Sequence, residues 1–342
     1  DVSIEAVGGK NLEEAGVKLF CNHDKMSAVG LGFKIILNHI QLGKRIADYL
    51  INDYKPDLVL LIDYGGFNLN MAKVLKRHGM KIFYYIPPQI WASRKWRINT
   101  VKKYIDKVIT IFPFEISMYK EKGIDAEFAG HPLVNQLPTL DKKEEFYSQN
   151  GIDLNKKLVS VFPGSRIFEI KNLLKIFLKS VEIINKKVPD VQFVICQAPT
   201  IKDEQMIDAV KSDIKILKNK NYELLAYSDA LILASGTVAL EAALYDTPMI
   251  ISYKGPELFY WIYLLVRCIK KVSLPNIITG EDIVPELVQH KAKPEIVAEH
   301  IISLLTDSEK YNEMKDKLKM VRHFLTEKNS AFEAAEIILK NL

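Results

Sequence analysis

The sequence predicts an α/β protein built from two doubly wound domains, each a parallel β-sheet covered by helices on both faces. Short apolar segments that end in Gly, Pro or Asp alternate with segments of helical period along both halves of the chain, and this alternation is typical of parallel sheets. A length of 342 residues is enough for two domains of ordinary size. Ligands of such folds bind beyond the carboxyl ends of the strands, so we expect a cleft between the two domains.

The expected elements follow from apolar runs and turn residues. In the first half we expect strands at residues 4–7, 57–62, 81–86, 107–111 and 126–129, with a helix over 69–78. In the second half we expect strands at 158–162, 191–195, 230–233 and 249–253, and long helices from 294 to 342. Pro138 and the charged residues after it mark a boundary. This predicts an N-terminal domain at 1–138, a C-terminal domain at 139–320 and a helical tail at 321–342.

The composition narrows the class of protein. The 47 Lys and Arg against 42 Asp and Glu give a net charge of +5, which suits anionic ligands or an anionic membrane surface but is too weak to indicate nucleic-acid binding. The three Cys and seven His lack the spacing of a disulfide framework or a metal site. The longest apolar run, 258–266, is too short to span a membrane and is followed by Arg267, Lys270 and Lys271. We therefore expect a protein of a reducing compartment with no metal site.

The segment Ser235–Glu241 places one carboxylate in apolar surroundings. All residues from Val238 to Leu244 except Glu241 are apolar, which indicates a buried helix. A buried ionised carboxylate is costly unless something binds it. The amides of Ser235, Gly236 and Thr237 suit a phosphate, and Glu241, one helical turn beyond Thr237, can accept hydrogen bonds from ribose hydroxyls. This predicts a nucleotide diphosphate site; the alternative is that Glu241 pairs with an Arg or Lys distant in sequence.

Two further strand ends carry candidate site residues. Ser165 and Arg166 follow the strand at 158–162 across a Gly turn, and an Arg at this edge can bind a diphosphate in a forked geometry. The alternative is a helix start with a surface Arg. Asp63 follows the strand at 57–62 and precedes two glycines, which predicts a general base. The alternative is a helix N-cap.

Other segments carry weaker signals. Gln89 and Trp91 lie in a Pro-rich, aromatic segment after the strand at 81–86; we expect them to line the site or, alternatively, to form a structural bend. His131 follows another strand, and a structural histidine with satisfied hydrogen bonds is the favoured interpretation. The apolar segments 26–40 and 258–266 fit membrane-surface patches or, equally well, buried helices.

Together these segments resemble the lipid-A-disaccharide synthase family, in order and across the whole chain. A Gly-Ser-Arg or Ser-Gly-Thr motif alone is weak, but this many ordered matches are specific. The matching stretches are Met26–Gly30, Lys55–Asp63 with Phe67 and Asn68, Pro88–Ala92, Phe112–Glu115, Gly130–Leu133, Pro163–Arg166 with Glu169 and Ile170, Ala234–Thr237 with Glu241, Val272–Asn276, and Pro285–Leu287.

The resemblance implies a GT-B fold of two Rossmann-like domains and a reaction without metal or cofactor. It implies that UDP-2,3-diacylglucosamine and 2,3-diacylglucosamine 1-phosphate (lipid X) are joined with inversion into a β-1,6 disaccharide, releasing UDP, in Gram-negative lipid A and lipopolysaccharide synthesis. By the same resemblance, Asp63 is the base that deprotonates the acceptor's 6-hydroxyl, Arg166 and Asn276 hold the diphosphate beside Ser235–Thr237, and Glu241 holds the ribose. Because both substrates carry acyl chains, we expect a cytoplasmic protein bound peripherally to the inner face of the inner membrane. An oligomer is compatible with the sequence.

The sequence departs from the family in two places. Tyr64, Gly65 and Gly66 stand where many members have a Pro and a second acid, so that loop offers no second carboxylate. The family's N-terminal strand and its Gly-Glu-x-Ser-Gly-Asp loop have no counterpart in these residues. We therefore expect a strand–loop–helix unit of roughly 30 residues to precede Asp1, and little or no turnover without it.

Two other kinds of protein remain as alternatives. One is another UDP-sugar enzyme of the same fold, such as the N-acetylglucosaminyltransferase of peptidoglycan synthesis or a UDP-sugar epimerase. The other is a non-catalytic UDP-sugar-binding protein of the membrane surface.

Overall fold

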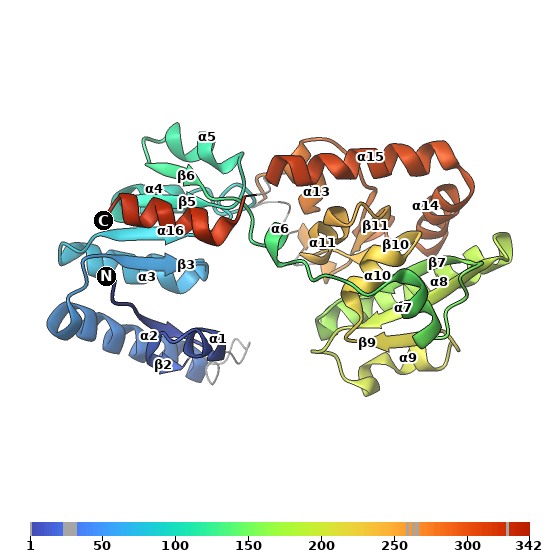
Figure 1. Cartoon of the computed structure of the whole chain (residues 1–342), viewed down its shortest axis with the longest axis horizontal. Coiled ribbons are helices and arrows are strands. Elements are labelled where there is room, and N and C mark those ends of the chain that lie inside the picture. Colours follow the sequence, from blue (N-terminus) through green and yellow to red (C-terminus); the bar gives the residue numbers. More distant parts are fainter. Residues whose placement is uncertain (1, 23–32, 258–259, 262–263, 265–266, 326–327) are drawn as a thin grey trace. The chain divides into compact units, whose positions relative to one another are not determined.

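A computed structural model describes residues 2–22, 33–257, 260–261, 264, 267–325 and 328–342. The chain divides into two compact units, and Figure 1 labels their helices and strands. The first unit comprises Asp1–Val59 and Tyr64–Lys81, and the second comprises Leu60–Asp63 and Ile82–Leu342.

The first unit contains a two-stranded parallel sheet with helices. Strands β1 (Glu5–Gly8) and β2 (Lys18–Asn22) are joined by α1 (Lys10–Glu14). Helix α2 (Phe33–Asp48) continues into a π-helical turn (Tyr49–Tyr54), and α3 (Gly65–Arg77) packs against α2. The Glu5 carboxylate accepts hydrogen bonds from Lys18 Nζ at 2.5 Å and from the Tyr49 hydroxyl at 2.7 Å, so one acidic side chain ties the first strand to the second strand and to the helix.

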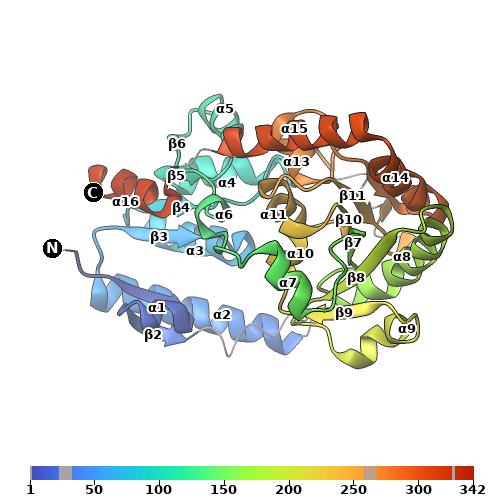
Figure 2. The same ribbon diagram turned by 45° about the vertical axis from the view of Figure 1, so that its right-hand side comes forward.

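The second unit begins with a four-stranded sheet in the order β3-β4-β5-β6. Its strands are β3 (Val59–Ile62), β4 (Ile82–Tyr85), β5 (Lys107–Thr110) and β6 (Ala126–Phe128), with helices α4 (Arg97–Tyr104), α5 (Glu115–Lys120) and α6 (Leu133–Gln136). Strands β4, β5 and β6 pair in parallel. The C-terminal helix α16 (Ser330–Lys340) returns to this sheet, where Ala334 and Ile337 pack with Ile109 and Ala129 (Figure 2).

The rest of the second unit is built on a six-stranded sheet in the order β12-β11-β10-β7-β8-β9, in which all neighbouring strands are parallel. From β7 and β10 at the centre, the chain winds outward in opposite directions, which is the doubly wound arrangement expected from the sequence. The strands are β7 (Lys157–Phe162), β8 (Val191–Gln197), β9 (Lys215–Lys218), β10 (Ala230–Ala234), β11 (Met249–Tyr253) and β12 (Glu286–Val288).

Helices cover both faces of this sheet. They are α7 (Lys143–Gln149), α8 (Ile167–Lys187), α9 (Ile207–Val210), α10 (Asn221–Tyr227), α11 (Val238–Leu244), α13 (Leu274–Thr279), α14 (Pro294–Thr306) and α15 (Ser308–Leu325), with 3₁₀ turns at Asp203–Met206 and Gln289–Lys291.

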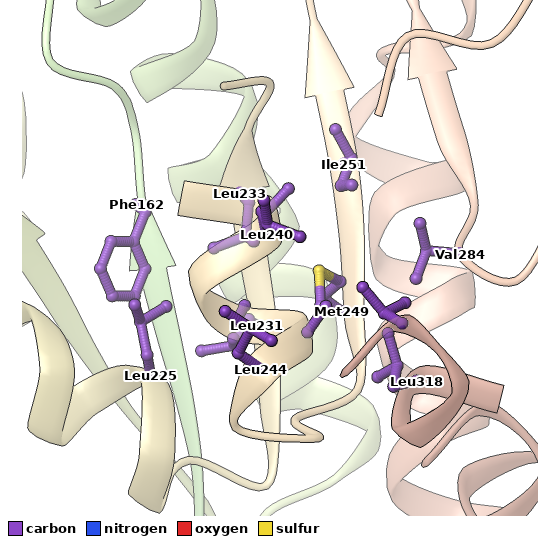
Figure 3. Close-up of a cluster of buried hydrophobic side chains, with 14 of the residues drawn as sticks. Phe162, Leu225, Leu231, Leu233, Leu240, Leu244, Met249, Ile251, Val284 and Leu318 are labelled. Atoms are coloured by element: carbon purple, nitrogen blue, oxygen red, sulfur yellow. The ribbon is translucent and has the colours of Figure 1, made fainter. Parts of the chain in front are cut away.

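The period-two alternation of the strands separates two apolar cores. Leu231 and Leu233 of β10 pack with Leu240 of α11 and Leu318 of α15 in one core (Figure 3). The alternate residues Ala230 and Ile232 lie in the other core, with α8 and α14. Strands buried on both faces need apolar residues at nearly every position, which is why β10 is a continuous apolar run and β7 is apolar from Leu158 to Phe162 except at Ser160.

All the strands expected from the sequence form, with ends shifted by a few residues, but three further strands were not expected. Strand β9 (Lys215–Lys218) has charged, exposed ends, β12 (Glu286–Val288) has three residues, and β2 (Lys18–Asn22) also has exposed ends. Residues 26–32 of segment 26–40 and most of segment 258–266 lie outside the described residues, while residues 33–40 belong to helix α2. No helix in the described part of the chain is long and apolar enough to cross a membrane. The expected domain limits at 138 and 320 stay predictions.

Candidate functional site

One carboxylate fixes the loop after β7. Gly164 has a φ of +122°, and a Cβ there would come within 2.5 Å of Glu169, so only glycine fits. Glu169 Oε2 accepts the amides of Ser165 at 2.8 Å and Arg166 at 3.2 Å, and Oε1 accepts from Arg166 Nη1 at 3.0 Å. The Glu169 side chain is 7% exposed and that of Arg166 is 70% exposed. The loop is therefore rigid, and it presents an accessible guanidinium at the start of α8.

The loop after β10 leaves amide groups unused. The Ser235 amide donates to the Ser252 carbonyl at 2.9 Å, which ties the loop to β11. Thr237 has helical backbone angles and makes no side-chain cap, and α11 begins at Val238. Over the residues that the structure describes, the amides of Gly236 and Thr237 donate to no other backbone group. Unused amides at a helix start suit an anion.

Both loops lie at the same point of the sheet. Strands β7 and β10 are hydrogen-bonded neighbours. From β7 the chain continues through β8 and β9 to one edge of the sheet, and from β10 it continues through β11 and β12 to the other edge. In open α/β sheets, ligands bind beyond the carboxyl ends of the strands at this topological switch point. The order of strands therefore places Gly164–Arg166 and Ser235–Thr237 where a ligand is expected.

Glu241 lies half-buried on α11, between the fully buried Leu240 and Ala242. Burial raises the pKa of the Glu241 carboxyl, and no charge or hydrogen bond from the described residues lowers it. The Arg or Lys partner considered from the sequence is thus not found in the described ranges. Burial raises the pKa values of the Tyr222 and Tyr245 phenols, and the negative charge of Glu241 raises them further. The carboxylate has acceptor capacity that the protein leaves unused.

A pocket of about 930 Å³ in the second unit joins these groups. Four segments supply most of its lining: Gln89–Arg94 after β4, Phe162–Glu169 after β7, Ala234–Glu241 after β10, and Lys271–Ile277. The expected site residues that line it are Gln89, Trp91, Ser165, Arg166, Ser235, Gly236, Thr237 and Glu241. Asp63, His131 and Asn276 are not among the described residues that line it.

The segment after β4 forms an aromatic wall of the pocket. The Gln89 carbonyl accepts the Ala92 amide at 3.1 Å, which closes a turn around Trp91. The Cys268 amide donates to the Ala92 carbonyl at 3.0 Å, so this turn is tied to the segment that follows residue 264. The Trp91 ring is 9% exposed and packs edge-on against Phe112 and Phe114.

Asp63 follows β3 in a constrained conformation. Its φ is +46°, in the left-handed region that is uncommon for residues other than glycine. The Asp63 amide donates to the Tyr85 carbonyl at 3.1 Å, and its own carbonyl accepts the Tyr84 hydroxyl at 2.6 Å. The backbone is therefore held from both sides while the side chain is exposed. Such strain is found at functional sites more often than elsewhere.

His131 has a structural environment. Its ring is 8% exposed, lies 5.1 Å from the Phe112 ring, and accepts the Leu133 amide on Nδ1 at 3.2 Å. Burial lowers the pKa of His131 to about 4, so the ring is neutral near pH 7. Its burial and its packing on Phe112 favour a structural role, which stays a prediction.

The Asn276 side chain is fully engaged by the protein. Its Nδ2 donates to the Val284 carbonyl and to Glu286 Oε1, both at 2.9 Å, and its Oδ1 accepts the amides of Ile283 and Val284. Glu286 also accepts the Ser273 amide and hydroxyl. Both side-chain N–H groups of Asn276 are used within the protein, where they brace the segment that lines the pocket. The diphosphate contact implied by the family resemblance stays a prediction.

Sequence reasoning missed Glu169 and Lys271 as pocket residues. Glu169 occurs three residues after the helix start at Arg166, the spacing at which an acidic side chain reaches back to the first amides, and this signal was available. Lys271 was expected only as part of a membrane patch, but it lines the pocket and pairs with Asp282. Within the described ranges, no cluster of His, Cys, Asp and Glu forms a metal site.

The doubly wound parallel six-stranded sheet and the pocket at its switch point define an α/β protein of the GT-B class. Structures with this fold include the UDP-GlcNAc 2-epimerase from Neisseria meningitidis bound to UDP-GlcNAc, with a TM-score of 0.64, 14% identity, and coverage of 96% of this chain and 87% of that chain. A calicheamicin glycosyltransferase also shares it, with a TM-score of 0.59, 13% identity, and coverage of 98% and 90%.

The chain belongs to the lipid-A-disaccharide synthetase family, whose model matches residues 1–341. The lipid-A-disaccharide synthase of Coxiella burnetii is 35% identical over 343 residues, covering 99% of this chain and 90% of that protein. The lipid-A-disaccharide synthase of Geobacter sulfurreducens is 33% identical over 347 residues, covering 100% and 90%. The family expected from the sequence motifs is confirmed, and the chain is a glycosyltransferase of the hexosyltransferase kind.

Proposed function

We propose that this chain joins UDP-2,3-diacylglucosamine to lipid X and releases UDP. The Glu241 carboxylate, which forms no ion pair with any described residue, carries the proposal, because it lies in the pocket one helical turn beyond a loop of the anion-binding type. The family match and the names of the relatives support the choice of substrates. The same whole-chain match favours this reaction over those of other UDP-sugar enzymes.

The donor binds at the switch point. The unused amides of Gly236 and Thr237 and the Arg166 guanidinium bind the diphosphate, and Glu241 accepts hydrogen bonds from the ribose hydroxyls. Binding to two hydroxyl donors favours the ionised form of Glu241, which offsets part of the cost of its burial. Arg94 and Lys271 line the same pocket and add positive charge around the leaving diphosphate.

Asp63 is the proposed base. Its carboxylate takes the proton from the acceptor's 6-hydroxyl as that oxygen attacks the anomeric carbon of the donor on the face opposite the diphosphate. The bond between the anomeric carbon and the diphosphate oxygen breaks, UDP leaves with the bonding electrons, and the configuration inverts. The exposed side chain and the doubly anchored backbone of Asp63 support this role. Asp63 is the only carboxylate in its loop, since the residues that follow it are Tyr64, Gly65 and Gly66.

Both substrates carry acyl chains, so the protein is proposed to work at a membrane surface. In the second unit, the side chains of Trp96 and Trp261 are 63% and 60% exposed. The bridge between Ser93 and Arg267 connects the two segments that carry these rings. Arg94 and Lys95 lie next to Trp96 in the sequence, and Arg267 and Lys270 follow Trp261 by six and nine residues. Exposed tryptophans among cations are typical of proteins that bind anionic membrane surfaces. An oligomer remains compatible with this proposal.

One assay tests the proposed function. The protein is incubated with UDP-diacylglucosamine and lipid X in detergent, and the disaccharide and UDP are followed together; equal amounts of both are expected. Epimerised donor without disaccharide would identify an epimerase instead. UDP binding without any product would identify a non-catalytic binding protein.

A further inference from the structure

A buried carboxylate lies behind the aromatic wall of the pocket. Glu115, the first residue of α5, is 1% exposed. Its Oε1 accepts the indole N–H of Trp91 at 2.9 Å. Its Oε2 has no hydrogen-bond partner in the part of the chain that the structure describes. Trp91 lines the pocket and Glu115 does not, so the indole separates the carboxylate from the pocket.

No Lys or Arg in the described part of the chain forms an ion pair with this carboxylate. The titratable groups near it include Tyr119 on the same helix, on which Tyr84 of β4 also acts, and His131, whose ring contacts Phe112. Among the described residues, the buried Tyr119 hydroxyl also has no hydrogen-bond partner, and His131 is neutral near pH 7. Burial raises the pKa of Glu115 to about 7. The hydrogen bond from Trp91 and the nearby backbone N–H groups of Phe112 and Ile111 lower this pKa, but they offset the effect of burial only in part.

The arrangement is costly for a purely structural role. The indole needs one acceptor, which an amide or a backbone carbonyl can supply without a charge. A buried oxygen without a partner costs free energy, and an ionised one costs more. Energetically unfavourable local arrangements are concentrated at functional sites, so the group that Glu115 contacts is a candidate for a functional role. Here that group is Trp91.

We propose that Glu115 is a positioning residue that acts through Trp91: its carboxyl group holds the indole N–H and thereby sets the orientation of the ring that lines the pocket. The hydrogen bond fixes one edge of the ring from behind, and the edge contacts with Phe112 and Phe114 fix its plane. The rest of the ring is then presented to the ligand as a preformed aromatic surface, and preorganisation of this kind strengthens binding. The inference rests on the proposed function only in taking a UDP-sugar as the ligand of the pocket.

The ring's orientation can be followed directly. The chain has three tryptophans, so replacing the exposed Trp96 and Trp261 by Phe leaves Trp91 as the only indole. In this background we expect the Trp91 emission to change with pH around neutrality, as Glu115 gains or loses its proton. Glu115→Gln should keep an acceptor for the indole and abolish the pH dependence. An unchanged pH profile in Glu115→Gln would overturn the inference.

A double-mutant cycle tests whether Glu115 acts through Trp91. Glu115→Leu should weaken UDP-sugar binding about tenfold, the factor expected for losing a hydrogen bond to a charged group. Trp91→Phe removes the N–H donor, so Glu115→Leu should have little further effect on binding in that variant. Equal effects of Glu115→Leu with and without the indole N–H would show that Glu115 acts in another way.

The outcome separates this inference from the proposed function. Glu241→Gln is measured alongside and should weaken UDP binding whatever the role of Glu115. If Glu241→Gln weakens binding while the Glu115 variants do not, the inference fails and the proposed function stands. If neither weakens binding, the ligand assignment of the pocket itself is wrong. A thermal melt of each variant shows that it is folded, and Glu115→Gln keeps the test valid if Glu115→Leu does not fold.

Discussion

Phe162, the last residue of β7, is the register partner of Leu233 in β10. One residue beyond Leu233 the strand ends, so the loops that begin at Pro163 and Ser235 leave the sheet side by side. They belong to the two oppositely wound halves of the sheet, which diverge from this pair. A single pair of strand residues therefore brings together an Arg-bearing turn and an amide-bearing helix start that lie about 70 residues apart in the sequence.

Glu241→Gln should weaken UDP affinity by roughly 1.5–3 kcal/mol, because hydrogen bonds from the ribose to a charged acceptor would be replaced by bonds to a neutral one. Isothermal calorimetry measures the effect. Glu182→Gln, at an exposed position of α8 outside the pocket, is the matched control and should bind as the parent does. Unchanged affinity in Glu241→Gln would remove the ribose assignment. In the parent, UDP affinity should fall as the pH drops below the raised pKa of Glu241.

Asp63→Asn should lower turnover by about 10²–10⁴ while UDP affinity is retained, since the amide cannot accept the proton from the acceptor hydroxyl. Asp57→Asn is the control: Asp57 is exposed just before the opposite end of β3. Turnover is measured by disaccharide formation and binding by calorimetry. Near-parental turnover in Asp63→Asn would assign the base to another residue.

The sequence alone predicted the doubly wound six-stranded sheet because its central strands, β7 and β10, are buried on both faces and so carry mostly apolar residues. It missed β9, whose sequence Lys215-Ile216-Leu217-Lys218 has a short apolar centre and exposed ends, because an edge strand needs less burial. Glu241 could be singled out because an isolated charge in an apolar helix is visible in sequence. The engagement of Asn276 by Glu286 and Val284 could not be predicted, because it depends on contacts that only the folded loop creates.

Gly164→Ala should destabilise the fold by about 1–3 kcal/mol, the cost of one residue held in a strained backbone conformation. The added methyl would also meet Glu169, whose carboxylate holds the loop. Gly66→Ala serves as control, because a Cβ there would meet nothing within 4 Å and the position is helical. Urea denaturation gives both values. Equal stability of the two variants would contradict the constraint deduced for the loop after β7.

Trp96→Ser with Trp261→Ser should reduce binding to vesicles that contain anionic lipid, because both exposed rings would be lost from the proposed membrane surface. Reversing the charges of Arg267 and Lys270 should reduce binding further, and more strongly at low salt. Phe332→Ser is the control, since Phe332 is 62% exposed on α16, away from both tryptophan segments in the sequence. Sedimentation with vesicles measures binding. Equal losses of vesicle binding in the tryptophan, charge-reversal and Phe332 variants would indicate non-specific adsorption.

Glu115 should make the stability of the protein depend on pH. Its pKa rises from an ordinary value of 4.5 to about 7 in the folded protein. Between these values the folded state binds more protons than the unfolded state, so the free energy of unfolding falls as the pH rises through this range. The stabilisation is complete below pH 4.5 and is lost above the folded-state pKa. A shift of this size corresponds to roughly 3 kcal/mol for a fully buried group.

Glu115→Gln removes the titration, so the difference in unfolding free energy between parent and variant should change by about this amount between pH 4 and pH 8. Urea denaturation at each pH measures this difference, and Glu182→Gln, which alters an exposed carboxylate, should show a much smaller change. A difference that stays constant with pH would show that the buried carboxyl group of Glu115 does not titrate in this range.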